Sequence, residues 1–309
     1  MKTTRKMKKI KRLSFFNDGI ESIDLKINKK DLKNFSKNIF SKINFKNLFL
    51  SKKKFLKLKS HKGVNPRPGR NLAEKIDTDH IFSNKYLIEK LNKVLGKNWR
   101  VLDYKFVVGM PDQFIPLWVQ KECNNMAAPN LGAFLKYKNQ NCTFFRGIDF
   151  HQDIIDYPGR NPDFITLYLY LTDVKKNDAP IIVLRKSHKL LNQVFPHKLK
   201  KNMKKENSYI FEYKNKKIIN LDKITITGKA GNTYIWHPFL LHGTSNCKSK
   251  KPRISLRILF DKNSHIDKNS QLDKVNLGIK YKSSSLITRI DKDKNDKLFL
   301  RKNIIQSES

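Results

Sequence analysis

Two residues that can bind a metal stand two apart in the stretch GIDFHQDIIDY, residues 147–157. They are His151 and Asp153. In an extended strand, positions i and i+2 point to the same face, so both side chains would project together while Gln152 faces the other way. An imidazole and a carboxylate on one face are either a hydrogen-bonded pair or two ligands of a metal ion.

A third ligand is offered by the stretch GNTYIWHPFLLHGTS, which holds His237 and His242. His242 is followed by a glycine at the end of an apolar run, where a side chain can turn inward at the end of a strand. His237 precedes a proline, which fixes the local backbone and indicates no ligand role. We therefore prefer His242 as the ligand, and His237 could support the site through a hydrogen bond. Two nitrogen ligands and one carboxylate are typical of non-haem Fe(II) oxygenases.

A strand that begins at Arg253, eleven residues after His242, bears on the cosubstrate of such an enzyme. On an octahedral iron, a 2-oxo acid can bind through its keto oxygen and adjacent carboxylate, and dioxygen takes the last position. The distal carboxylate of that acid needs a fixed cation, and an arginine supplies two parallel hydrogen bonds. Arg253 is the preferred anchor, and Arg257 on the same strand face is the alternative. Ser255 shares that face and could donate a further hydrogen bond.

The order of these motifs carries a resemblance. HQD, then HPFLLHGTS, then an arginine eleven residues past the second histidine resembles the phytanoyl-CoA dioxygenase family of Fe(II)/2-oxoglutarate-dependent oxygenases. The stretch APIIVLRKSHK, residues 179–189, is similar to a segment of that family that ends in Ser-His after an apolar strand. The resemblance covers about residues 100–260 and implies a double-stranded β-helix, the cupin-like jelly roll, wrapped by helices.

The resemblance also implies a role for each residue of the site. The cofactors would be Fe(II), 2-oxoglutarate as cosubstrate, and dioxygen. The implied iron ligands are His151, Asp153 and His242, and the implied cosubstrate residues are Arg253, Ser255, Gln152 and Thr244.

The expected reaction is hydroxylation of a small organic substrate with release of succinate and carbon dioxide. Related halogenating enzymes lack the carboxylate ligand, which frees a position for halide, whereas Asp153 is present here. The motifs serve iron and 2-oxoglutarate and do not imply a CoA thioester substrate. The positive net charge mildly favours an anionic substrate.

The chain from about residue 100 predicts a mainly β fold. Short β-prone runs are punctuated by Gly, Pro, Asn or Asp, and no long helices intervene, which indicates an antiparallel sandwich or barrel. In FITLYLYLTD, residues 164–173, leucines and an isoleucine alternate with Thr166, Tyr168 and Tyr170. We expect both tyrosines to be ordinary strand residues.

Helical periodicity is confined to the first hundred residues. Residues 31–59 place apolar side chains at roughly helical intervals, which predicts a basic amphipathic helix that rests on the domain, rests on a membrane surface or is loosely ordered. Residues 77–96 predict one helix that ends at Gly96. We divide the chain into a lysine-rich, partly helical extension (1–63), an oxygenase domain (64–262) and a polar basic C-terminal segment (263–309).

The formal net charge of +38 raises an alternative function. A basic protein on a degenerate oxygenase scaffold could bind nucleic acid or an anionic membrane. However, only 12 of the 65 basic residues are arginines, the preferred residue for phosphate and guanine contacts, and the lysines are spread over the chain. This pattern favours a compositional origin, so no specific nucleic acid is expected. A third possibility is a cupin-type metalloenzyme that uses no 2-oxo acid.

Cysteine usage and hydropathy indicate the compartment. Three widely spaced cysteines without a CxxC argue against a disulfide framework and against a zinc–thiolate site. No apolar run reaches the length of a membrane-spanning helix. The basic start lacks the apolar stretch of a signal peptide, so we expect a cytoplasmic protein.

Overall fold

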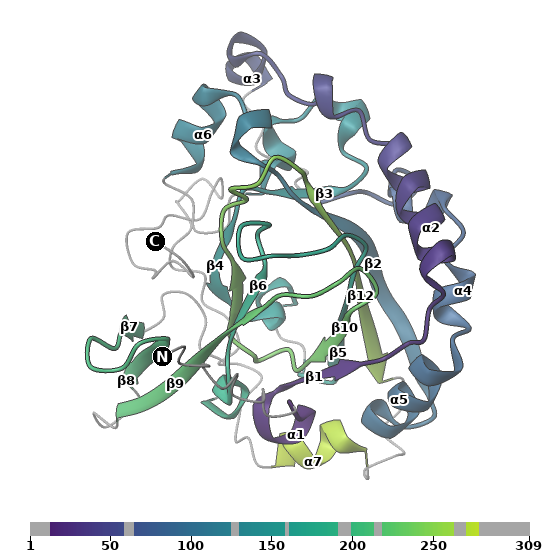
Figure 1. Ribbon diagram of the computed structural model, residues 1–309, viewed down its shortest axis with the longest axis vertical. Coiled ribbons are helices and arrows are strands. Elements are labelled where there is room, and N and C mark those ends of the chain that lie inside the picture. The colour runs from purple at the N-terminus through teal and green to yellow at the C-terminus, as the bar shows by residue number, and fades with distance from the viewer. Residues whose placement is uncertain are drawn as a thin grey trace, which may run out of the picture.

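Two six-stranded sheets face each other and curl into a barrel, which confirms the predicted double-stranded β-helix (Figure 1). The computed structural model describes residues 13–58, 65–124, 130–157, 161–190, 199–212, 218–262 and 270–277. Residues 1–12 and 278–309, which belong to the predicted N-terminal extension and C-terminal segment, lie outside this description.

The first sheet has the strand order β1-β10-β5-β12-β2-β3. Its strands are antiparallel except for the parallel pair β2 and β3. The long strand β12 lies at its centre and pairs with β2 on one side and β5 on the other. In sheet order the bounds are Ile20–Ile23, Thr233–Trp236, Phe164–Tyr170, Arg253–Lys262, Trp99–Gly109 and Thr143–Phe145.

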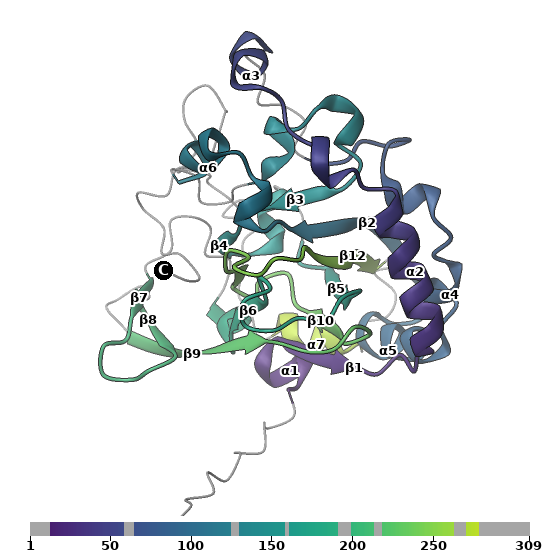
Figure 2. The same cartoon turned by 45° about the horizontal axis from the view of Figure 1, so that its top comes forward.

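The second sheet has the order β4-β11-β6-β9-β8-β7 and is antiparallel throughout. Its inner strands close the barrel, while β7, β8 and the start of β9 extend beyond it (Figures 1 and 2). In sheet order the bounds are Ile148–His151, His242–Thr244, Ile181–Leu184, Ile218–Ile226, Ser208–Glu212 and Leu199–Lys201.

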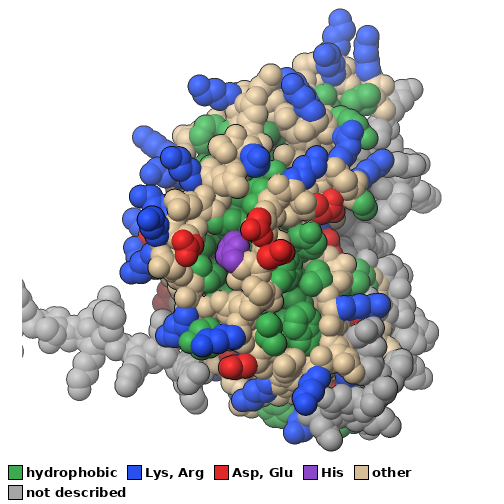
Figure 3. Space-filling view, turned by 90° about the vertical axis from the view of Figure 1, so that its right-hand side faces the viewer, with side chains coloured by type: hydrophobic (Ala, Val, Ile, Leu, Met, Phe, Trp, Pro, Cys, Tyr) green, Lys and Arg blue, Asp and Glu red, His purple; other side chains and the backbone are tan. Residues whose placement is uncertain are grey.

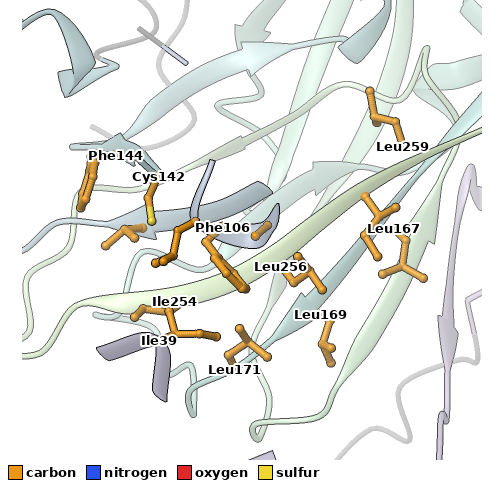
Figure 4. Close-up of a cluster of buried hydrophobic side chains, with 14 of the residues drawn as sticks. Ile39, Phe106, Cys142, Phe144, Leu167, Leu169, Leu171, Ile254, Leu256 and Leu259 are labelled. Atoms are coloured by element: carbon orange, nitrogen blue, oxygen red, sulfur yellow. The ribbon is translucent and has the colours of Figure 1, made fainter. Parts of the chain in front are cut away.

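The alternating strand β5 separates two cores. All seven of its residues are buried. Leu167 and Leu169 face outward and pack in one apolar cluster with Ile39, as Figure 4 shows. Tyr168 and Tyr170 face the barrel interior, where they join Val183 of β6 in a second cluster. The alternation of β5 therefore places an apolar face under the helices and a face with Thr and Tyr side chains inside the barrel.

Helices cover the outer face of the first sheet (Figures 1 and 2). The seven α-helices among the described residues are α1 (Phe15–Asp18), α2 (Lys29–Ser41), α3 (Lys52–Leu58), α4 (Asp79–Phe82), α5 (Lys85–Leu95), α6 (Leu117–Cys123) and α7 (Gln271–Leu277).

The helical stretch predicted over residues 31–59 forms two helices, α2 and α3. The Asn28 side chain caps α2 by accepting a hydrogen bond of 2.7 Å from the Lys30 backbone N–H. Between the helices, the Leu50 N–H donates to the Phe134 carbonyl at 2.9 Å. The Lys136 N–H donates to the Leu48 carbonyl at 2.9 Å. The backbone here is used for tertiary hydrogen bonds and cannot continue the helix.

The prediction of a single helix over residues 77–96 is wrong in number, because the stretch forms two helices. α4 ends at Phe82 and α5 starts at Lys85. Asn84 stands between them and caps α5, accepting hydrogen bonds from the backbone N–H groups of Tyr86 and Leu87 at 3.1 and 3.2 Å. The predicted end is right: Gly96 follows α5 with a φ of 87°, which favours glycine.

Part of the predicted N-terminal extension belongs to the same folded unit as the barrel. β1 pairs with β10 at the edge of the first sheet. Leu32, Phe35 and Ile39 of α2 are buried against that sheet. These residues therefore stabilise the barrel by burying apolar surface.

Basic side chains are scattered over the surface. Figure 3 shows Lys and Arg side chains spread across the face covered by α2, α4 and α5, with acidic and hydrophobic side chains between them. None of the helices that the structure describes has the length and apolar character needed to cross a membrane.

Candidate metal centre

The three predicted ligands meet at one end of the barrel. His151 is the last residue of β4 and His242 the first of β11, and their Cα atoms are partners in the pairing of these strands. Asp153 follows Gln152, whose backbone is extended, so the alternation continues past the end of β4. One nitrogen from each histidine and one carboxylate oxygen lie within 4.8 Å of one another.

Both histidines are oriented by the same local hydrogen bond. His151 Nδ1 lies 2.9 Å from the Asp149 carbonyl oxygen, and His242 Nδ1 lies 2.9 Å from the Leu240 carbonyl oxygen. A carbonyl only accepts, so each Nδ1 carries the hydrogen and each Nε2 presents its lone pair. Burial lowers the pKa of His242 to about 4, and the charge of His151 acts in the same direction. His242 is therefore a neutral imidazole near pH 7, which is the form that binds metals.

The Asp153 carboxylate is held at both oxygens. Oδ2 accepts a hydrogen bond of 2.5 Å from the Thr166 hydroxyl and one of 2.8 Å from the Trp236 indole N–H. Oδ1 accepts from Arg257 Nη2 at 2.9 Å and lies 3.7 Å from His242 Nε2. These bonds fix the carboxylate plane and direct Oδ1 toward the two histidines.

The electrostatics of the site keep this carboxylate ionised. Burial alone raises the pKa of Asp153, but the charge of Arg257, followed by the neighbouring histidines and the hydrogen bond from Thr166, outweighs it. The net effect holds the pKa of Asp153 below its ordinary value. A charged carboxylate oxygen beside two imidazole nitrogens is a good ligand set for a divalent cation.

Arg253 lies deeper in the barrel and is almost fully buried. It is 1% exposed, and within the described part of the chain its Nε and Nη1 atoms have no hydrogen-bond partner. The guanidinium lies over the ring of Tyr168 at 5.5 Å from the ring centroid. A buried guanidinium with unused donors is costly unless an anion binds it. This is the environment that an acid cosubstrate would satisfy.

Ser255 and Gly109 complete the surroundings of Arg253. Ser255 is fully buried, and its hydroxyl likewise has no partner among the described residues. Gly109 pairs with Arg253 across β2 and β12, and a Cβ there would lie 3.2 Å from Arg253 Nε. The glycine therefore leaves room for the guanidinium.

The tyrosines of β5 have specific contacts, unlike the ordinary strand residues that we expected. Tyr168 lies under Arg253, as described above. The Tyr170 hydroxyl donates to the Ile226 carbonyl at 2.8 Å and accepts from the Ile181 N–H at 3.2 Å. Ile181 and Ile226 belong to the second sheet, so Tyr170 ties the two sheets together across the barrel.

The other predicted residues have mixed positions. Thr244 is buried on β11, two residues after His242 and on the same strand face. The Gln152 side-chain amide donates to the Phe239 carbonyl at 2.7 Å. His237 is turned away from the ligands, with Nε2 at 2.9 Å from Asn276 Oδ1 and Nδ1 accepting from the Phe239 N–H. Of the two histidines, only His242 lies with His151 and Asp153.

Sequence reasoning missed two residues that contact Asp153 and considered a third only in another role. Thr166 and Trp236 were not identified, and Arg257 was considered only as an alternative anchor. Thr166 and Trp236 are partners in the pairing of β5 with β10, so both reach Asp153 from adjacent strands. The alternation of β5 placed Thr166 on the polar face, which is the only signal that the sequence held for it.

Comparison with known proteins agrees with this site. The family model described as phytanoyl-CoA dioxygenase (PhyH) matches residues 108–255, a range that contains all three candidate ligands and Arg253. No curated protein sequence matches the chain.

Similar solved structures include three proteins of low sequence identity. The epimerase SnoN, in complex with Fe3+, alpha ketoglutarate and nogalamycin RO, is 11% identical with a TM-score of 0.46, and the match covers 80% of each chain. The alpha ketoglutarate dependent carbocyclase SnoK is 10% identical with a TM-score of 0.46, covering 80% of this chain and 81% of SnoK. HygX from Streptomyces hygroscopicus, with nickel and 2-oxoglutarate bound, is 11% identical with a TM-score of 0.42, covering 81% of this chain and 84% of HygX.

Proposed function

We propose that this protein, whose residues 108–255 match the family model described as phytanoyl-CoA dioxygenase, is a non-haem Fe(II)/2-oxoglutarate-dependent oxygenase that hydroxylates a C–H bond of a small organic substrate. Succinate and carbon dioxide are the coproducts. The observation that carries the proposal is the joint presence of the ligand set and of Arg253, a buried guanidinium with unused donors.

In this proposal His151, Asp153 and His242 hold Fe(II). Their two imidazole nitrogens and one carboxylate oxygen match the facial set of this enzyme class. The bound iron, with its cosubstrate, supplies the activation of dioxygen. The retained carboxylate favours hydroxylation over halogenation, because it leaves no ligand position for a halide.

Arg253 and Ser255 bind 2-oxoglutarate in this proposal. The guanidinium grips the distal carboxylate, and the Ser255 hydroxyl donates to the same group. Both side chains project from β12 on one face, which fixes the distance of that carboxylate from the metal ligands. Thr244 borders the cosubstrate from β11, and Gln152 holds the backbone at Phe239 beside the site.

Anaerobic titration with Fe(II) and then 2-oxoglutarate tests the proposal. The complete enzyme should give a weak visible charge-transfer band, and it should form succinate in air when candidate substrates are added. His242→Ala should lose both signals. His80→Ala is the matched control, because His80 is an exposed histidine of α4 outside the site. A basic binding protein on a degenerate scaffold would give neither signal, and that result would refute the proposal.

A further inference from the structure

A pocket lies at the end of the molecule that carries α3, beside residues 45–51 and just before α6. It is a pocket of about 450 Å3, within the roughly 300–1,000 Å3 of small-molecule sites. Its polar lining includes three lysines, Lys46, Lys54 and Lys136, and no acidic residue. Its apolar lining residues are Phe45, Leu48, Phe49, Leu50, Phe114 and Pro116.

The walls of this pocket are held by tertiary contacts. The segment before α3 is bonded to residues 134–136 by the two backbone hydrogen bonds described above. Phe55 of α3 packs against Trp118 of α6, with ring centroids 5.3 Å apart, and against Phe134 at 4.9 Å. Backbone hydrogen bonds and aromatic contacts therefore hold together the segments that carry the pocket.

The charge around the pocket is of one sign. Among the residues that the structure describes, Lys46 and Lys54 form no ion pair, and the Lys136 amine contacts the neutral side chain of Asn47. The sequence of α3, KKKFLKL, contributes further lysines and no carboxylate. Uncompensated cations beside an apolar pocket favour a ligand with an anionic head and an apolar body.

Two exposed leucines, Leu117 and Leu58, lie close in sequence to residues that line the pocket. Leu117, directly after the lining residue Pro116, is 76% exposed. Leu58 is 58% exposed and follows Lys54 by four positions, which places both on one side of α3. Figures 1 and 2 both show α3 and α6 at the same end of the molecule. Leucines that face water beside lysines are the pattern of a surface that lies in a membrane interface.

We propose that this end of the molecule docks on a lipid bilayer that carries anionic headgroups. Lys46, Lys54 and Lys136 contact the lipid phosphates, Leu58 and Leu117 enter the interface, and the pocket receives part of one acyl chain. A nucleic acid fits less well, because the pocket offers no arginine for phosphate or base contacts. Binding of a nucleic acid would also leave Leu58 and Leu117 in water, with no gain from burial. This proposal is independent of the oxygenase activity.

Vesicle co-sedimentation of the full chain tests the charge contribution. Because the net charge of +38 attracts any anionic surface, the informative comparison is between variants of equal charge. Lys46→Glu/Lys54→Glu should raise the concentration of phosphatidylglycerol-containing vesicles needed for half binding by about tenfold or more. Lys85→Glu/Lys93→Glu is the control. These exposed lysines lie at the two ends of α5, away from the pocket, and the control should shift binding less than about threefold.

Insertion is tested by a dye that responds to its surroundings. The native cysteines Cys123, Cys142 and Cys247 are all buried, so an introduced surface cysteine is labelled selectively. Leu117→Cys labelled with such a dye should shift to the blue on phosphatidylglycerol vesicles and not on phosphatidylcholine alone. Met203→Cys is the control, because Met203 is 94% exposed at a distant loop and should show no shift.

Three results would overturn the proposal. One is equal loss of vesicle binding in the two charge-reversal variants. Another is a blue shift at both labelled positions or at neither. The third is retention of the wild-type protein on DNA that depends on Lys46 and Lys54 while vesicle binding does not. Melting temperatures of all variants exclude misfolding, and if the Lys46→Glu/Lys54→Glu variant is unstable, Lys46→Gln/Lys54→Gln replaces it.

Discussion

Arg257 Nη2 donates a hydrogen bond of 2.9 Å to Asp153 Oδ1, the oxygen that lies nearest His242. The candidate metal ligand thus already has a cation as its partner. Both side chains are buried, with Arg257 9% and Asp153 3% exposed. Without a metal, the guanidinium offsets the cost of burying the carboxylate. A bound metal ion would offset the same cost. Arg257 is therefore a positioning residue for Asp153, while Arg253 remains the proposed anchor of the cosubstrate.

This relationship predicts a stability effect that depends on metal. Arg257→Met removes the partner of a buried charge, which typically costs about 3–5 kcal/mol. A divalent cation at the three ligands compensates the same carboxylate, so the loss should be much smaller in the metal-loaded protein. Anaerobic urea unfolding of the variant and the wild type, each with and without Fe(II), measures both free energies of unfolding.

Lys229→Met is the matched control for that experiment. Lys229 pairs with Asp173 at 2.8 Å, but both side chains are exposed, at 82% and 50%. Loss of such a pair should cost no more than about 1 kcal/mol, with or without metal. If Arg257→Met destabilised the metal-free and metal-loaded proteins equally, its contact with Asp153 would have no part in the metal site.

Arg253 and Ser255 should differ in their effect on the cosubstrate. Arg253→Gln removes charge-assisted hydrogen bonds worth about 1.5–3 kcal/mol, so the KM for 2-oxoglutarate should rise by roughly tenfold to a hundredfold. Ser255→Ala removes one neutral hydrogen bond, and the rise should be about fivefold. Fe(II) affinity should stay unchanged in both variants. An enzyme whose turnover survives Arg253→Gln without change would be the cupin-type alternative that uses no 2-oxo acid.

That His151, Asp153 and His242 lie together could be predicted from the sequence, because residue type and spacing point to it. His151 and Asp153 two apart need only an extended backbone to share a face. Arg253 could be identified because it opens a strand whose alternation is visible. In the same way, the mainly β fold followed from short punctuated runs.

The partners of Asp153 could not be predicted, because they depend on strand register. Thr166 and Trp236 reach the same oxygen only because β5 pairs with β10 in the register that sets them opposite each other. A shift of one residue would turn both to the other face. The break between α4 and α5 is different, since the sequence holds its signal: Asn84 is a residue type that commonly caps a helix N-terminus.

A buried pair of histidines predicts a loss of stability in acid. Burial lowers the pKa of His188 to about 4, and burial together with the charge of His188 lowers the pKa of His237 to about 3. Both histidines titrate near 6.5 in the unfolded chain, so between pH 6.5 and about 4 the unfolded state binds more protons. The free energy of unfolding should fall as the pH falls through this range, by at most about 1.4 kcal/mol per pH unit for each histidine.

The slope of that pH dependence identifies the groups. The rings of His188 and His237 lie 5.5 Å apart, with the Phe16 carbonyl and Asn276 as their neighbours. His237→Gln should make the slope between pH 6.5 and 4 shallower, measured by urea unfolding of metal-free protein at several pH values. An unchanged slope would assign the acid sensitivity to other groups. Above pH 7 these two histidines should contribute no pH dependence to the free energy of unfolding.

Tyr170 should contribute to stability and not to metal binding. Its hydroxyl is buried and bonds to backbone groups of Ile226 and Ile181, and burial raises its pKa, so it stays protonated. Tyr170→Phe leaves a carbonyl and an N–H inside the barrel without this partner, which should cost about 1–3 kcal/mol. Fe(II) affinity, measured by anaerobic titration, should be unchanged because the ligands lie on other strands. Tyr137→Phe is the control, since Tyr137 is 57% exposed and its loss should alter neither quantity. Weaker iron binding in Tyr170→Phe would show that the distance between the two sheets sets the geometry of the ligands.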